Sequence, residues 1–323
     1  MEFRRRRFLR LAAGATVLPI LAERARAQTY PARPVRVIVG FPAGNSPDII
    51  TRLTCHYLSD HLGQQFVVEN RPGAGSTIAT EAALNAAPDG YTLLGIVMSN
   101  TINVSLYPNL KYDFGRDLAP VAGIADAPYV VLVTESLPAK TVPEFIAFAR
   151  ANPGKIMMAS GGTGTSTHVI GEMFMMMAKV SLVHVPYRGN FMPDLISGQV
   201  QVSFAPIPQS VEFIRAGKLR ALAVTTPSRL ASLPDVPTVA EFLPGFTTTG
   251  WYGLGAPRNT PPEIVGRLNQ TVNGALADPK FKEQLAGLGV NPLPMTPAEL
   301  GKLIAADIDR WAKVVKFAGI KAE

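Results

Sequence analysis

Apolar runs alternate with amphipathic segments along most of the 323-residue chain. The nearly uninterrupted apolar stretch 35–41 is typical of a strand buried on both faces. The stretch that follows predicts a helix whose N-cap, first turn and apolar stripe are, in order, Ser46, Pro47, Asp48, Ile50, Leu53 and Tyr57. Further strands are expected at 66–69, 91–98, 156–159, 182–187, 199–204 and 219–225, and closing helices at 262–276, 279–288 and 297–317. This alternation predicts an α/β fold with parallel sheets covered by helices.

The elements form two sets, and no flexible linker separates them. Two apolar stretches, 128–134 and 249–257, are expected to be paired strands that cross between the sets as short parallel connections. A first lobe would then comprise residues 28–128 and 250–323, and a second lobe residues 129–249. Two crossover strands between α/β lobes predict a hinge with a ligand cleft beside it.

The charge distribution argues against a nucleic-acid partner. The chain has a net charge of +7, but residues 1–27 hold seven arginines and two glutamates. The other 296 residues carry 24 basic and 22 acidic side chains, a balance of only +2. No basic stripe for a phosphate backbone is left.

The first 27 residues have the layout of an export signal, with an arginine-rich start, an apolar stretch 11–22 and the triplet Ala25-Arg26-Ala27. Cleavage is expected after Ala27. The string RRRFLR at 5–10 is similar to the twin-arginine signal, although an ordinary secretory signal also fits. The apolar stretch is too short for a membrane anchor. We therefore expect a soluble periplasmic protein.

Signatures of catalysis and of cofactor binding are missing. The chain lacks both the dinucleotide fingerprint and the phosphate-binding loop of nucleotide-binding proteins. Four histidines and a single cysteine, Cys55, make a metal cluster improbable, and Cys55 is expected to pack in a core. The segment 164–168 approaches a nucleophile elbow around Ser166 but lacks its final glycine and an evident partner acid. We expect no metal, no cofactor and no enzyme activity.

Three loops at predicted strand ends are rich in glycine and hydroxyl side chains: PAGNSPD (42–48), NRPGAGST (70–77) and SGGTGTSTH (160–168). Ligands of open α/β sheets bind where strands end and helices begin. Backbone N–H groups and the helix dipole favour an anion there. Because the phosphate motifs are missing, a carboxylate is the expected anion, held mainly by neutral donors.

A series of motifs resembles the Bug family, the periplasmic solute-binding proteins of tripartite tricarboxylate transporters. The motifs are YPARPVRVIVGFPAG, VVENRPGAG, PDGYTLL, HVPYRG, SGQV, LRALAVT, PDVPTVAE, WYGLGAP and FAGIKAE, in one order from Tyr30 to the C-terminus. The resemblance implies a type II-like periplasmic-binding-protein fold, a small carboxylate in the cleft and delivery to a membrane permease. The chain departs from the family pattern at Asn45, Ser76 and Gln201, which stand where Gly, Gly and Asp are common, and in a shorter segment after Gly189.

The loops and the resemblance together give one set of candidate ligand-binding residues: Ala43, Gly44, Asn45, Ser46, Asp48, Gly75, Ser76, Thr77, Ser99, Gly162, Thr163, Gly164, Thr165, Ser166, His168, Tyr187 and Arg188. Asp48 has two interpretations, because it could complement a helix dipole or meet a ligand group through water. The protein is expected to be monomeric. Two alternative functions stay open, a sensory or regulatory binding protein of the same fold and a periplasmic hydrolase.

The arginine pair generates the first testable prediction. Changing Arg5 and Arg6 together to Lys should leave uncleaved precursor inside the cell, because the twin-arginine route requires both guanidinium groups. Cell fractionation and immunoblotting measure the outcome. Normal export of the double variant would instead assign the ordinary secretory route.

Overall fold

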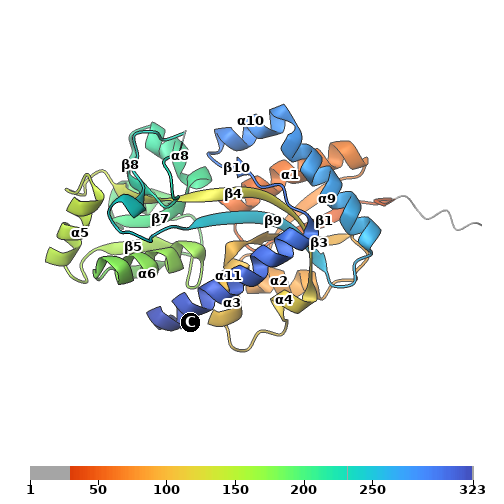
Figure 1. Ribbon diagram of the computed structural model, residues 1–323, viewed down its shortest axis with the longest axis horizontal. Coiled ribbons are helices and arrows are strands. Elements are labelled where there is room, and N and C mark those ends of the chain that lie inside the picture. Colours follow the sequence, from red (N-terminus) through yellow and green to blue (C-terminus); the bar gives the residue numbers. More distant parts are fainter. Residues whose placement is uncertain (1–29, 231, 322–323) are drawn as a thin grey trace, which may run out of the picture.

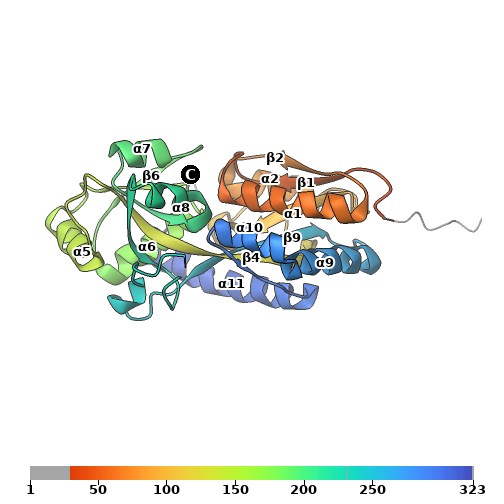
Figure 2. The same cartoon turned by 90° about the horizontal axis from the view of Figure 1, so that it is seen from above.

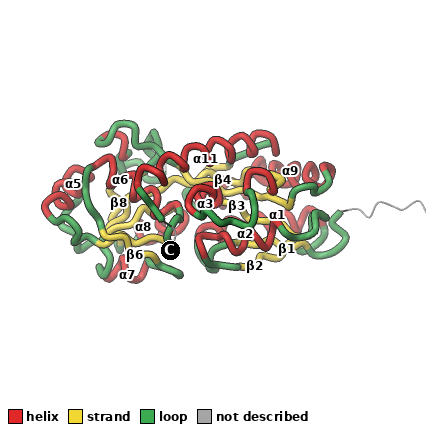
Figure 3. Tube along the Cα trace, turned by 90° about the horizontal axis from the view of Figure 1, so that it is seen from below, coloured by secondary structure: helices red, strands yellow, loops and turns green. Residues whose placement is uncertain are grey.

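Two groups of strands and helices lie side by side along the long axis of the molecule (Figure 1). The computed structural model describes residues 30–230 and 232–321; the expected signal and its cleavage site lie outside them. The two groups stay side by side when viewed from above and from below (Figures 2 and 3), and we call them the first and second lobes. No helix of the described residues has the length and apolar character of a membrane span.

The first lobe holds both ends of the described chain. Its elements are β1 (Val35–Val39), α1 (Ser46–Leu62), β2 (Phe66–Asn70), the 3-10 turn η1 (Ala74–Ser76), α2 (Thr77–Leu84), β3 (Thr92–Val97), α3 (Met98–Leu106), α4 (Phe114–Asp117), β9 (Thr249–Pro257), α9 (Pro262–Ala277), α10 (Pro279–Gly287), β10 (Asn291–Pro292) and α11 (Pro297–Ala318). The second lobe contains α5 (Val142–Ala151), β5 (Met157–Ser160), α6 (Ser166–Ala178), β6 (Val183–Pro186), α7 (Met192–Ser197), β7 (Val202–Pro206), α8 (Ile207–Arg215), β8 (Leu219–Val224) and η2 (Val239–Glu241). The long strand β4 (Leu118–Thr134) belongs to both lobes.

One mixed sheet runs through both lobes in the order β2-β1-β3-β9-β4-β7-β5-β6, with β8 and β10 also pairing with β4. The pairs at its two ends are parallel, whereas β4 is antiparallel to β7, β8, β9 and β10. The expected parallel pairing is therefore confirmed at the two ends of the sheet and wrong near its centre, where the crossover strands are antiparallel. The chain leaves the first lobe along β4 and returns along β9, so these strands must run in opposite directions.

Both predicted crossover segments are strands in the structure, but they do not pair with each other in the way that the sequence predicts. Leu118 to Pro128 of β4 pair with Pro257 to Thr249 of β9, whereas the expected segment 129–134 pairs with β7 and β8 of the second lobe. The connection is thus one long strand with a shorter antiparallel neighbour. Nearly every residue of β4 is buried, which explains its continuous apolar pattern.

Helix α1 departs from its prediction by a small shift. It begins at Ser46 with Asn45 as the N-cap, one residue before the predicted cap. Ile50, Thr54 and Leu58 are buried, whereas Leu53 and Tyr57 are only half-buried. Burial of Cys55 is confirmed, and its thiol pKa is raised to about 12 by that burial. The three closing helices end within one residue of their predicted limits.

Helix α11 runs along the sheet and packs against α3 and β4 and against α6 of the second lobe. Its buried residue Asp307 accepts a hydrogen bond of 2.6 Å from the indole Nε1–H of Trp251 on β9, and Arg310 lies 3.6 Å away. Burial raises the pKa of the Asp307 carboxyl, although the hydrogen bond and Arg310 oppose that shift. The last helix is therefore tied to a crossover strand by a buried carboxylate.

Asp307 generates a prediction with a defined sign. The pKa of Asp307 is higher in the folded protein than its ordinary value of 3.8. The folded protein therefore becomes less stable as the pH rises above 3.8, because Asp307 must then ionise while buried. Asp307→Asn keeps an acceptor for Trp251 and should remove this loss. Asp307→Ala leaves the indole N–H unpaired and should be less stable than Asp307→Asn by about 1–3 kcal/mol at pH 7.

Urea unfolding at pH 5 and pH 7 measures both effects, with exposed Asp309→Asn on the same helix as the control. Equal stability of the Ala and Asn variants would contradict a role for the Trp251 hydrogen bond.

Candidate functional site

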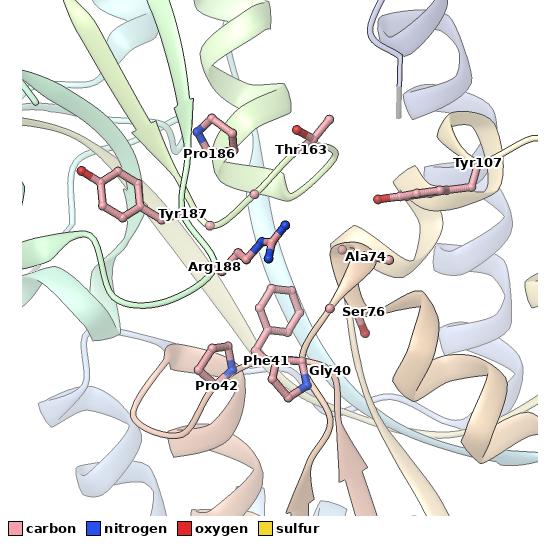
Figure 4. A pocket seen from close by; sticks show the side chains of 15 residues that line it. Gly40, Phe41, Pro42, Ala74, Ser76, Tyr107, Thr163, Pro186, Tyr187 and Arg188 are labelled. Carbon is pink, nitrogen blue, oxygen red and sulfur yellow. The ribbon is translucent and has the colours of Figure 1, made fainter. Parts of the chain in front are cut away.

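The loops at the strand ends of both lobes surround a cavity of about 550 Å³, the large cavity. Its lining is Gly40, Phe41, Pro42, Pro72, Gly73, Ala74, Gly75, Ser76 and Tyr107 from the first lobe and Gly161, Gly162, Thr163, Pro186, Tyr187 and Arg188 from the second. Arg188 reaches from the loop after β6 towards the segment of Ala74 and Ser76, whereas the ring of Tyr187 points away (Figure 4). Arg188 is exposed and has no ion-pair partner among the described residues.

A second, small cavity of about 40 Å³ shares Phe41 and Gly161 with the large one. Its other lining residues are Asn45, Pro47, Val97, Met98, Ser99, Tyr129, Thr165, Ser166, Thr167, Phe191, Pro206, Gln209, Trp251 and Tyr252. Both lobes and both crossover strands contribute. The small cavity is therefore an aromatic-walled space with hydroxyl groups of both lobes at its surface.

Asp48 holds the first loop in shape. It is 3% exposed, and its carboxylate accepts hydrogen bonds of 2.9 Å from the Gly44 amide, Arg52 Nε and Asn70 Nδ2. Burial alone would raise the pKa of Asp48, but these hydrogen bonds outweigh it and lower the pKa. The carboxylate thus joins the loop before α1 to the end of β2, and the Gly44 amide is already occupied.

The second loop has an unusual backbone that α3 supports. Residues 73–76 all have positive φ, including the non-glycine residues Ala74 (44°) and Ser76 (86°). Such left-handed residues store strain, which occurs preferentially at functional sites. Asn103 Nδ2 donates to the Gly75 carbonyl at 2.7 Å, and Asn100 Nδ2 donates to Ser76 Oγ at 3.2 Å. Two buried amide side chains of α3 therefore stabilise this turn.

The start of α6 is hydrogen-bonded across the cleft. The Ser166 amide donates to Ser99 Oγ of α3 at 3.1 Å, and the Tyr129 hydroxyl donates to Ser166 Oγ at 2.5 Å. Burial raises the pKa of Tyr129 to about 12 against the opposing hydrogen bond, so its hydroxyl keeps its proton. A first-turn amide and three hydroxyl groups meet at this point, which is a donor set suited to an anion.

The lobes also approach closely at Gly164. This residue has φ of +76°, and a Cβ placed on it would lie 1.8 Å from Leu106 Cδ2 of α3. A larger residue here would need both a strained left-handed backbone and a shift of the Leu106 side chain, so the position favours glycine.

The structure distributes the predicted residues over three environments. The large cavity is lined by Gly75, Ser76, Gly162, Thr163, Tyr187 and Arg188, and the small cavity by Asn45, Ser99, Thr165 and Ser166. Neither lining includes Ala43, Gly44, Ser46, Asp48, Thr77, Gly164 or His168. Of this last group, Asp48, Gly44, Gly164 and His168 take part in hydrogen bonds or contacts that shape the loops.

Several lining residues were missed by the sequence analysis. Tyr129, Trp251 and Tyr252 look like core residues of apolar strands, and only the course of β4 and β9 beside the cleft exposes them to it. Gln209 follows the end of β7, so the rule that ligands bind at strand ends could have found it. Arg71, a cation within the second loop (70–77), pairs with Glu69 at 2.5 Å. The described residues contain no group of three or more potential metal ligands.

Comparison with known proteins agrees with this geometry, which defines a two-lobed binding protein with an interlobe cleft. Residues 50–320 match the family model of the tripartite tricarboxylate transporter family receptor, and the chain belongs to this family. Protein BugT of Bordetella pertussis is 38% identical over 300 residues, covering 91% of this chain and 92% of BugT. The resemblance to the Bug family is confirmed.

Solved structures also agree. The structure of R. palustris Rpa4515 with adipate has a TM-score of 0.87 at 36% identity, covering 90% of this chain and 99% of that one. MatC from Rhodopseudomonas palustris with bound malate has a TM-score of 0.84 at 33% identity, covering 88% and 100%. The periplasmic binding protein BugD has a TM-score of 0.87 at 33% identity, covering 91% and 100%. The expected two-lobed fold is confirmed.

Proposed function

We propose that the protein captures a small carboxylate in the interlobe cleft and delivers it to the membrane permease subunits of a tripartite transporter. The observation that carries the proposal is the hydrogen bond between the Ser166 amide and Ser99 Oγ. The Ser99 oxygen occupies the acceptor position at the N-terminus of α6, where a carboxylate oxygen would accept from the same amide. The adipate and malate of related structures belong to the same chemical class.

A carboxylate bound between the lobes would replace the internal hydrogen bond between the Ser166 amide and Ser99 Oγ with several hydrogen bonds to its own oxygens. The Ser166 amide and the hydroxyls of Ser99, Ser166 and Tyr129 would each donate to it, and hydrogen bonds to a charged acceptor are stronger than neutral ones. The remainder of the ligand would extend past Phe41 and Gly161 into the large cavity. Arg188 adds a positive charge there, which attracts anions.

Residues 28–128 and 250–323 are proposed to move as one lobe and residues 129–249 as the other. The supporting observation is that the small cavity has room for only a few atoms, so a ligand needs the lobes to part before it enters. β4 and β9 are the strands about which such a rotation would occur.

Export to the periplasm, cleavage after Ala27 and a monomeric state are part of the same proposal. The family consists of solute-binding proteins of transporters, for which a periplasmic position and access to a permease are required. Residues 1–27 have the layout of an export signal, and they lie outside the described residues.

Removing either cleft hydroxyl should weaken carboxylate binding. A hydrogen bond to a charged group contributes about 1.5–3 kcal/mol, so Ser99→Ala and Ser166→Ala should each raise Kd by about 10- to 150-fold. Ser105→Ala, on the same helix as Ser99, is the matched control and should bind as wild type. Isothermal titration calorimetry with adipate and malate gives these affinities.

A thermal-shift screen first identifies which acids bind. A ligand at 100 times its Kd should stabilise the folded protein by about 2.7 kcal/mol, a clear rise in Tm. Mono-, di- and tricarboxylates, amino acids and neutral amides and sugars form the panel. Binding confined to neutral compounds, or unchanged affinity in both serine variants, would refute the carboxylate site.

Binding should also make the molecule more compact. Small-angle scattering should give a smaller radius of gyration at saturation with an acid from the screen than without it, because the lobes close on the ligand. An equal radius in the two states would count against the hinge.

A further inference from the structure

The second-lobe glycine loop, Gly161 to Gly164, is held by two histidines that do not line either cavity. His168 lies in the first turn of α6 and is 5% exposed, and its ring stacks on that of His184 from β6, with centroids 3.7 Å apart and planes 7° apart. The loop supplies Gly161, Gly162 and Thr163 to the large cavity. The stacked pair therefore lies directly behind a wall of the proposed site.

The hydrogen bonds define the state of His168. The Gly164 amide donates to its Nδ1 at 3.1 Å, so Nδ1 carries no proton. Its Nε2 lies 3.3 Å from Glu172 Oε1 on the next turn of α6, which requires the proton at Nε2. His168 is thus a neutral ring in one tautomer, and that tautomer is fixed from both sides.

His184 acts on the same loop through a serine. Its Nε2 is 2.6 Å from Ser160 Oγ, and the Gly162 amide donates to the same oxygen at 3.1 Å. Burial and, next, the neighbouring His168 ring lower the pKa of His184 to about 4. Two amides of one loop are therefore held by the two rings, Gly164 directly and Gly162 through Ser160.

We propose that His168 and His184 are positioning residues that hold the Gly161–Gly164 loop in its ligand-binding shape. This inference rests on the proposed function, because it assigns the loop to that site. Gly162 (φ +119°) and Gly164 (φ +76°) need specific partners to keep these conformations, since glycine is otherwise free to leave them. A second proton on His168 would place an N–H against the Gly164 N–H and release the loop.

The surroundings of the pair leave few other charges. Glu172 from α6 is the charged group in contact with it, and β5 contributes the neutral Ser160. Among the described residues, no other charged side chain forms a hydrogen bond or an ion pair with either ring. Arg188 follows β6 but lines the large cavity.

A crossed set of substitutions tests the proposal. An Asn side chain places its oxygen near the position of Nδ1, whereas a Gln side chain reaches the position of Nε2. His168→Asn and His184→Gln should therefore keep the loop, and His168→Gln and His184→Asn should loosen it. NMR measurement of amide hydrogen exchange at Gly162 and Gly164 reports how firmly the loop is held in the absence of ligand. His56→Gln, at an exposed histidine, is the control.

The expected result is faster exchange at Gly164 in His168→Gln and at Gly162 in His184→Asn, with near wild-type exchange in the two matched variants. The loosening variants should bind the acid that binds wild type best in the screen about 5- to 100-fold more weakly, as for one lost hydrogen bond.

Equal exchange in the Asn and Gln variants of each histidine would overturn the proposal, as would a proton on His168 Nδ1 in the ¹⁵N spectrum. Faster exchange with unchanged acid affinity would overturn the positioning role. The thermal-shift screen alone tests whether wild type binds a carboxylate, and a negative result there would refute the proposed function. The exchange pattern of the four histidine variants needs no ligand, so it tests the role of the histidines separately.

Discussion

The site depends on one strand that belongs to two lobes at once. β4 pairs with β9 along its first part and with β7 and β8 along its second, so a single backbone fixes the relation between the loops of each lobe. The loops before α1, α2 and α6 lie at strand ends in sheets anchored to β4. The aromatic residues Tyr129 and Trp251 reach the cleft because their strands run alongside it.

The hydrogen-bond donors of the cleft are largely satisfied by the protein itself. The Gly44 amide is bonded to Asp48, the Gly164 amide to His168 and the Ser166 amide to Ser99. Buried N–H groups need such partners in any case. Binding an anion is therefore an exchange of partners at one or two points, while most internal bonds keep the loops in place. This arrangement favours a pre-shaped site with low ordering cost on binding.

The sequence was sufficient for most strands, for the closing helices and for the three loops, because strand ends, glycines and helix starts have local signatures. It predicted neither α3 nor the first part of β4. It could not give the antiparallel partner of β4, since pairing is set by the path of the chain between lobes. It also could not show that Asp48 would be occupied by Arg52 and Asn70, or that His168 would meet His184 sixteen residues away. The Asp48–Arg52 pair has the i,i+4 spacing of a helix, but the contacts of Asp48 with Asn70 and of His168 with His184 join different elements whose separation carries no periodic pattern.

The close approach of Gly164 and Leu106 sets a limit on how far the lobes can come together. A side chain at 164 would meet the tip of the Leu106 side chain, so either Leu106 must move or the lobes must stay further apart. The length of ligand that the cleft can enclose is thus fixed partly by a residue that need not touch the ligand at all.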